Sequence, residues 1–269
     1  MHYELLGRLR VTDEKGSSSI GAKKIETLFA VLLIRAGHVV SLEQLITEIW
    51  GEAAPRRANA GLHVYVSQLR KFLHRPDRAE SPIVTHPPGY LLRLGTDEID
   101  FQVFENLVAG GRECARRRLY EEAAERFEKA LDLWRGPVLA DLRPGPITAG
   151  FATWLTETRL ECTEALIECR LKLGMHRETI GHLYSLVAEH PLREAFHRQL
   201  MLALYRSERQ ADALMAYQEA WRTLDDELGV RPCRSLQDLQ RAILDADDDL
   251  DVQLPVQTRR TVHDRAVSR

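Results

Sequence analysis

The stretch SLEQLITEIWG, residues 41–51, decides the fold because it carries the signals for both ends of a short helix. Ser41 is a preferred N-cap residue, and Gln44 stands at the capping-box position three residues later. The helix is expected to end at Trp50 and Gly51, since glycine commonly follows the last helical turn. Apolar residues recur at helical spacing on the face that we expect to be buried: Leu42, Leu45, Ile46 and Ile49.

A longer helix is predicted after Pro55. Its apolar stripe, with Tyr65 on the same inner side, consists of Ala58, Leu62, Val66, Leu69 and Leu73. The residues expected to face outward or to flank this stripe are mostly polar or basic: Arg56, Arg57, His63, Val64, Ser67, Gln68, Arg70 and Lys71. The outer surface of this helix is therefore cationic.

Two short strand-like runs follow the basic helix, over Ser81–Thr85 and Tyr90–Leu94. The residues between them, HPPG at 86–89, form a stiff turn because proline cannot continue a helix. A β-hairpin is therefore expected directly behind the basic helix.

The residues before Ser41 predict strands and then one more helix. His2–Val11 is typical of two short strands around Gly7, and the polar run Lys15–Ser19 is expected to be a turn before a third strand. A helix from Ala22 is expected to end at Gly37, with one buried face made of Ile25, Leu28, Phe29, Leu32 and Leu33.

The order of strands, two helices, a basic helix and a hairpin is that of a winged helix-turn-helix, whose third helix enters the major groove of DNA. Residues 55–93 contain 7 Lys/Arg and 2 Asp/Glu, and residues 1–96 contain 13 and 9, whereas the remaining residues contain 24 and 31. The basic part is the candidate for a polyanionic partner. The alternative is that the helix only exposes an ordinary solvated face.

From Asp100 onward the pattern is almost entirely helical. Ala123, Thr179 and Ala213 each precede a bulky residue by four positions, and the second and third copies are 34 residues apart, the tetratricopeptide period. We therefore expect a mainly α protein with a small β component, in which a TPR-like all-α repeat domain follows the winged helix. An α-bundle with coincidental spacing is the alternative.

Long motifs in both parts resemble a known family. VVSLEQLITEIWG, HVYVSQLRKFL and IVTHPPGYLL are similar to the OmpR-type winged helix, and in particular to the form in the Streptomyces antibiotic regulatory proteins (SARPs). ALDLWRGPVLADL and PLRExxxxxLMxALYRSxRQxxAL resemble the bacterial transcriptional activation domain of the same family. The implied division is a DNA-binding domain over 1–96, an activation domain over 97–246 and a flexible tail or linker over 247–269.

The resemblance implies a transcription activator that binds direct repeats in double-stranded promoter DNA, associates with itself there and recruits RNA polymerase, including the principal sigma factor, for antibiotic biosynthesis genes. The expected DNA-binding residues are Arg56, Arg57, Asn59, His63, Val64, Ser67, Gln68, Arg70, Lys71, Thr85 and His86. By analogy alone, the loop that contacts polymerase is Trp50, Gly51, Glu52, Ala53, Ala54 and Pro55. Many OmpR-type domains carry Arg where this chain has Ser67 and Gln68, so guanine recognition by arginine is not expected there.

Several classes of protein are disfavoured. The chain of 269 residues has no P-loop, no GxGxxG after a strand, no HExxH and no GxSxG, so we expect no catalysis and no cofactor. Its four cysteines lack metal-ligand spacing and are expected to be half-buried thiols, and the four tryptophans are expected at helix ends or in apolar faces. With neither a signal peptide nor an apolar span, a cytoplasmic location follows. A helical-repeat adaptor, an NTP-driven enzyme and a repressor of the same fold stay open.

Overall fold

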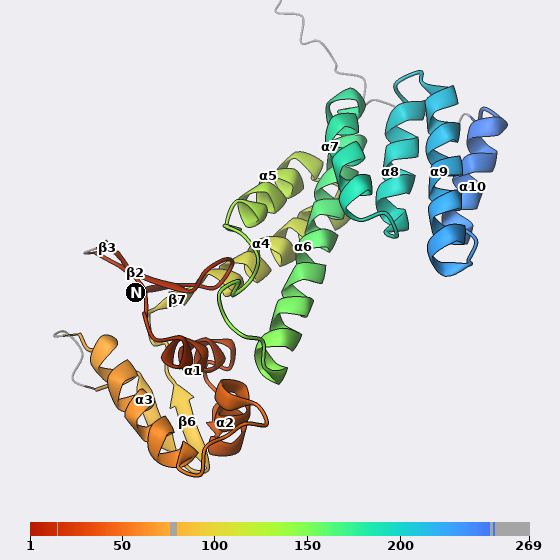
Figure 1. Cartoon of the computed structure of the whole chain (residues 1–269). Helices are drawn as coiled ribbons and strands as arrows, with labels where there is room; N and C mark the ends of the chain where they lie inside the picture. The colour runs from red at the N-terminus through yellow and green to blue at the C-terminus, as the bar shows by residue number, and fades with distance from the viewer. Residues whose placement is uncertain (15, 76–79, 248–249, 251–269) are drawn as a thin grey trace, which may run out of the picture. The chain divides into compact units, whose positions relative to one another are not determined.

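The computed structural model describes residues 1–14, 16–75, 80–247 and 250, and Figure 1 traces its elements. The chain divides into two compact units, Met1–Leu166 and Ile167–Arg269. Each unit is described by itself below. The tail predicted over 247–269 lies outside the described residues, apart from Asp247 and Leu250.

A four-stranded sheet opens the first unit, in the order β3-β2-β1-β7. Its strands are β1 (His2–Glu4), β2 (Arg10–Asp13), β3 (Gly16–Ser18) and β7 (Glu98–Ile99). The expectation of a turn over Lys15–Ser19 is wrong for residues 16–18, which pair antiparallel with β2. An exposed edge strand is held by backbone hydrogen bonds to one neighbour and buries no side chains. The polar Gly-Ser-Ser run therefore lacks the alternating apolar residues that would predict a strand.

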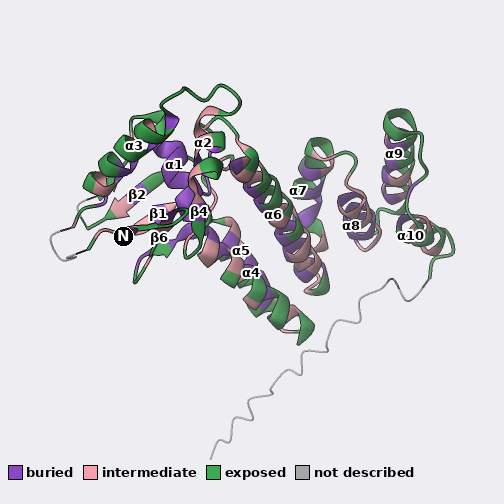
Figure 2. Ribbon diagram, turned by 90° about the horizontal axis from the view of Figure 1, so that it is seen from below, coloured by how far each residue is buried: buried purple, intermediate pink, exposed green. Residues whose placement is uncertain are grey.

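The predicted helices follow this sheet. Helix α1 (Lys23–Ile34) contains the five predicted apolar residues, but it is buried on almost every side, because Glu26, Thr27, Ala30 and Val31 are buried as well. In Figure 2 most of α1 carries the colour of buried residues. Helix α2 (Leu42–Trp50) begins with the predicted capping box of Ser41 and Gln44. On its inner side Leu45 is buried, while Leu42, Ile46 and Ile49 are only half-buried.

Helix α3 (Ala58–Phe72) and a second sheet complete the predicted winged helix-turn-helix. The sheet has the order β4-β6-β5, with β4 (Val39–Ser41), β5 (Ile83–His86) and β6 (Gly89–Leu92). The whole predicted stripe of α3 is buried, with Leu62 and Leu69 at 0% exposure. The hairpin is also confirmed, and its strands pair from Ile83–Leu92 to His86–Gly89.

The first unit continues past residue 96, where the sequence suggested a domain boundary. It includes β7 and the helices α4 (Asp100–Arg116), α5 (Tyr120–Leu131) and most of α6 (Pro146–Lys172). The reason is a buried connection: Asp100, at the start of α4, accepts hydrogen bonds from the backbone N–H groups of Leu5 and Leu6 at 2.8 and 2.9 Å. The guanidinium of Arg135 donates to the same carboxylate at 2.7 Å.

After the end of α6, the second unit contains four helices that pack against one another in succession: α7 (His176–Glu189), α8 (Glu194–Tyr205), α9 (Gln210–Leu228) and α10 (Arg234–Leu244). The two repeat positions in this unit, Thr179 and Ala213, are at most 1% exposed. Thr179 stands where a small residue was expected, and its buried hydroxyl is satisfied because it donates to the carbonyls of Met175 and His176. The mainly α, TPR-like fold class is confirmed.

Two expectations about side chains are wrong. Trp154 and Trp221 are 42% and 41% exposed and lie inside α6 and α9, although the tryptophans were expected at helix ends or in apolar faces. Three cysteines, Cys114, Cys162 and Cys169, are fully buried rather than half-buried, and Cys233 is exposed. Burial raises the pKa of the Cys162 thiol to about 12, so this cysteine is an inert packing residue.

Candidate nucleic-acid interface

The outer face of α3 and the residues leading into it form a continuous polar and basic surface. Arg57 is the N-cap residue of α3, and its side chain makes no capping hydrogen bond to the first turn. The first turn therefore combines the positive end of the helix dipole with two adjacent guanidinium groups, an arrangement that favours phosphate. The predicted contact residues that are exposed on or before α3 are Arg56, Arg57, Asn59, His63, Val64, Ser67, Gln68 and Lys71.

Arg70 differs from the other predicted contact residues of α3, because its side chain is half-buried and already donates hydrogen bonds within the fold. Its Nε and Nη2 donate to the carbonyl oxygen of Ile83 at 3.1 and 3.0 Å, and Nη2 also donates to the Thr85 hydroxyl at 2.9 Å. These bonds join α3 to β5. Arg70 therefore has a structural role in the wing, with the Thr85 hydroxyl as one of its acceptors. The phosphate contact expected of Arg70 stays a prediction.

His63 also contacts the wing. Its Nδ1 lies 2.7 Å from the hydroxyl of Tyr90, in the central strand β6. Tyr90 is 3% exposed and was not among the predicted site residues. One general signal could have found it, because a buried tyrosine usually needs a hydrogen-bond partner for its hydroxyl.

The tip of the wing is exposed at Thr85, His86, Pro87 and Pro88. It turns back at Gly89, where an added Cβ would lie 1.8 Å from the carbonyl oxygen of Val40, so only glycine fits. The Pro88 carbonyl accepts a hydrogen bond from Leu42 N, one of the first N–H groups of α2. The wing is therefore fixed to both neighbouring helices, α2 and α3.

Rigidity of this tip leads to a testable expectation. Replacing Pro87 and Pro88 with glycine restores backbone freedom that must be lost again on binding, and each replacement costs about 0.4–1 kcal/mol by the usual scale. The two replacements together should therefore lower the affinity for DNA by about fourfold to thirtyfold, measured by fluorescence anisotropy on a labelled duplex. Thermal melting of the helices α7–α10 should not change. Equal affinity in the double variant would mean that the wing tip makes no contact.

The predicted polymerase loop divides into two parts. Trp50 is the last residue of α2 and is half-buried, with its ring stacked on Tyr65 at a centroid distance of 5.7 Å and Lys24 Nζ at 5.3 Å. Trp50 is therefore a packing residue between helices. The remaining residues of the loop are all exposed: Gly51, Glu52, Ala53, Ala54 and Pro55.

Sequence reasoning also missed Glu48, which is 6% exposed on α2. Its carboxylate accepts from the backbone N–H of Ile147 and from the hydroxyl of Thr148, the latter at 3.1 Å. Because the first N–H groups of α6 have no partner within their own helix, Glu48 serves as their cap. The helix-turn-helix is thus joined to α6 through a buried polar contact.

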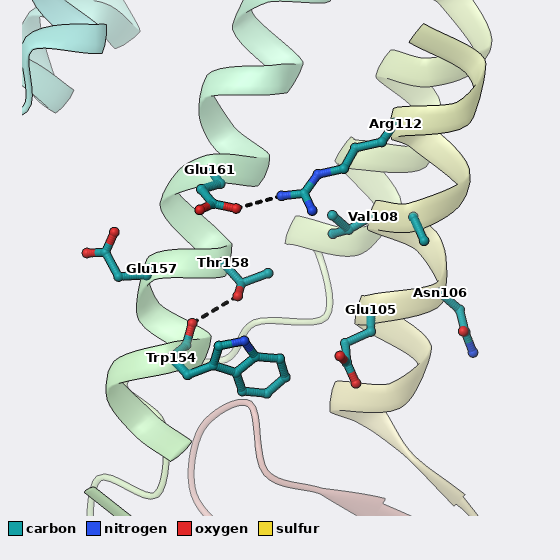
Figure 3. Close-up of a pocket in the computed structure, with 9 residues that line it drawn as sticks. Glu105, Asn106, Val108, Arg112, Trp154, Glu157, Thr158 and Glu161 are labelled. Carbon is teal, nitrogen blue, oxygen red and sulfur yellow. Dashed lines mark hydrogen bonds and ion pairs between the residues drawn. The ribbon is translucent and has the colours of Figure 1, made fainter. Parts of the chain in front are cut away.

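A hollow of about 520 Å³ between α4 and α6 has the opposite charge to the surface of α3. Figure 3 shows Trp154 and Glu161 on α6 opposite Glu105 and Arg112 on α4, with an ion pair between Arg112 and Glu161. Glu157, also on α6, is a further lining residue. Three carboxylates and one guanidinium leave this hollow acidic, so it repels phosphate. The basic surface of α3 is therefore the better candidate for DNA.

Comparisons with known proteins agree with this arrangement. The family model described as "Bacterial transcriptional activator domain" matches residues 99–244, and that described as "Transcriptional regulatory protein, C terminal" matches residues 20–92. Regulatory protein DnrI of Streptomyces peucetius is 36% identical over 93% of this chain and 94% of its own length. This chain belongs to the SARP family.

SARP relatives differ in length. Regulatory protein AfsR of Streptomyces griseus is 36% identical, and the chain spans 25% of its length. The solved structure of Mycobacterium tuberculosis EmbR in complex with a low affinity phosphopeptide is 35% identical and superposes with a TM-score of 0.86, over 91% of this chain and 65% of EmbR. SARPs and these relatives are transcriptional regulators, not enzymes. Among the described residues, no helix has the length and apolar character to cross a membrane.

Proposed function

We propose that this protein is a cytoplasmic transcription activator that binds direct repeats in promoter DNA and recruits RNA polymerase. The exposed face of α3 carries the proposal, because it places cationic and amide side chains beside a rigid wing. DnrI and the transcriptional regulator RedD of Streptomyces coelicolor are similar regulators, which supports control of antibiotic or other secondary-metabolite genes.

The residues of α3 would divide between phosphates and bases. Arg56, Arg57 and Lys71 would contact phosphates on either side of the groove, since cations at the ends of a groove-bound helix position it without reading sequence. The base contacts would come from Asn59, His63, Val64, Ser67 and Gln68. Glutamine and asparagine pair best with adenine, and Val64 can meet a thymine methyl group, so we expect an A·T-leaning half-site.

Contact with polymerase is proposed from the family resemblance. The exposed loop Gly51–Pro55 follows α2 and lies next in the chain to the first basic residues before α3, a position from which it could reach the principal sigma factor bound at the same promoter. The acidic composition of the helical repeats is unsuited to binding DNA. We therefore propose that the repeats support self-association of copies bound at adjacent sites.

Lys71 gives a specific test of the phosphate role. Lys71→Ala should weaken binding to every duplex alike, and it should reduce the slope of log K against log salt concentration by about 0.9, the value for one phosphate contact. The measurement is a salt titration with two unrelated duplexes. A change of sequence preference with an unaltered slope would mean that Lys71 contacts a base.

The proposed function is tested by selection from a random duplex library with the full chain, followed by footprinting of the enriched sequence on the promoter nearest its own gene. We expect enrichment of a tandem repeat and protection of both copies. Failure to enrich any sequence would favour a helical-repeat adaptor. Protection accompanied by a lower transcript yield from purified polymerase would favour a repressor.

A further inference from the structure

The imidazole of His63 is fixed by the wing, although the residue lies on the exposed face of α3. Its Nδ1 is 2.7 Å from the Tyr90 hydroxyl, and the two rings meet edge to face with centroids 6.3 Å apart. The Tyr90 ring is in turn covered by the Arg70 guanidinium at 5.9 Å, and Arg70 is itself bonded to β5. One nitrogen of His63 is therefore held in a defined place by Tyr90, whose ring is in turn covered by Arg70.

The direction of the hydrogen bond follows from the requirements of the buried phenol. Burial raises the pKa of Tyr90, so the hydroxyl keeps its proton at neutral pH, although the Arg70 charge lowers this pKa in part. A buried hydroxyl proton needs an acceptor, and His63 Nδ1 is the one acceptor it has among the described residues. When Nδ1 of a neutral imidazole accepts, the ring proton sits on Nε2.

We propose that Tyr90 sets the tautomer of His63 so that Nε2–H donates a hydrogen bond to a guanine in the major groove. The inference rests on the proposed DNA binding through α3. Nε2 is separated from Nδ1 by one ring carbon, and among the residues that the structure describes none forms a hydrogen bond with it. His63 would touch the base, and Tyr90 would act as a positioning residue.

The chemistry of the base edges selects guanine. In the major groove guanine presents two acceptors, O6 and N7, whereas adenine presents one acceptor beside a donor, thymine one acceptor beside its methyl group, and cytosine a donor. A single fixed N–H donor therefore ranks guanine first and cytosine last. This adds one guanine to a half-site that Gln68 and Val64 otherwise predict to be A·T-leaning.

The first test needs no DNA. Nitrogen-15 NMR of the full chain, at a pH where His63 is neutral, should show the Nε2–H tautomer in the wild-type protein and a mixture of tautomers in Tyr90→Phe. The phenylalanine variant keeps the ring under Arg70, and far-UV circular dichroism checks its fold. An Nδ1–H tautomer in the wild-type protein would overturn the proposal.

The second test uses the duplex that the wild-type chain enriches from a random library. Each guanine of this duplex is changed to cytosine in turn, and we expect one position at which the wild-type chain discriminates by about tenfold. His63→Ala and Tyr90→Phe should each reduce this discrimination to about twofold or less, and the double variant should lose no more. If Tyr90→Phe does not fold, His63→Ala still tests the base contact, because His63 is exposed and its replacement should not affect folding.

Lys71→Ala is the control in this experiment, because it should bind more weakly and keep the discrimination. If the wild-type chain enriches no sequence, the proposed function itself fails. A different outcome would leave DNA binding intact and contradict only the role of the tautomer. In that outcome the wild-type chain enriches a sequence, but at no position do both His63→Ala and Tyr90→Phe reduce the discrimination between guanine and cytosine.

Discussion

Replacing Asp100 with alanine should destabilise the first unit by about 3 kcal/mol or more, because it leaves several buried groups without a partner. The carboxylate is 3% exposed and accepts from the N–H groups of Leu5 and Leu6 and from Arg135. Without it, the backbone N–H groups of Leu5 and Leu6 lose their acceptor, and Arg135 keeps only its ion pair with Glu4.

The measurement is urea unfolding of the full chain followed by tryptophan fluorescence, since Trp50, Trp134 and Trp154 all belong to the first unit. A loss of this size lowers the midpoint by about 1 M urea or more. Asp141→Ala is the matched control, because Asp141 pairs with Arg8, a side chain that is 68% exposed, and such surface pairs contribute about 0–1 kcal/mol. Equal midpoints for the two variants would contradict the role given to Asp100.

Inserting about five base pairs between the two copies of the binding repeat should abolish cooperative binding, because half a helical turn places the second copy on the opposite face of the duplex. The proposed self-association raises occupancy through effective concentration and adds no base contact. We expect the affinity for the paired site to fall at least about tenfold, to the value for a single repeat.

An insertion of about ten base pairs is the control, because it returns both repeats to the same face and should restore part of the cooperativity. Electrophoretic mobility shifts on the three duplexes distinguish singly and doubly bound complexes. Equal cooperativity at all three spacings would rule out a rigid contact between adjacent copies, and the helical repeats would then need another role.

Local signals in the sequence were sufficient to predict most of the winged helix-turn-helix, which is the first part of the first unit. The capping box at Ser41 and Gln44 depends only on residues three apart, and the stripe of α3 depends on a period that a single helix must obey. The edge strand β3 was missed because its pairing with β2 requires backbone hydrogen bonds and no particular side chains.

The candidate site was less predictable, because its deciding contacts join residues distant in the chain. The outward direction of Gln68 and Lys71 follows from helical period, whereas the bonds of Arg70 to β5 and of His63 to Tyr90 depend on how the wing packs against α3. Glu48 is a similar case, since its partners on α6 are about 100 residues away. The spacing of apolar residues identifies which face of a helix is exposed. It does not identify the residues of other elements that contact part of that face.

The central claim is that this protein activates transcription by binding promoter DNA through the exposed face of α3. Its most direct test is the transcript yield in a run-off reaction with purified RNA polymerase, on a promoter that carries the enriched repeat. The wild-type chain should raise the yield, while a Gln68→Ala/Lys71→Ala variant of unchanged fold should leave it near the level of polymerase alone. An equal rise with both proteins, or a fall with the wild-type chain, would contradict the claim.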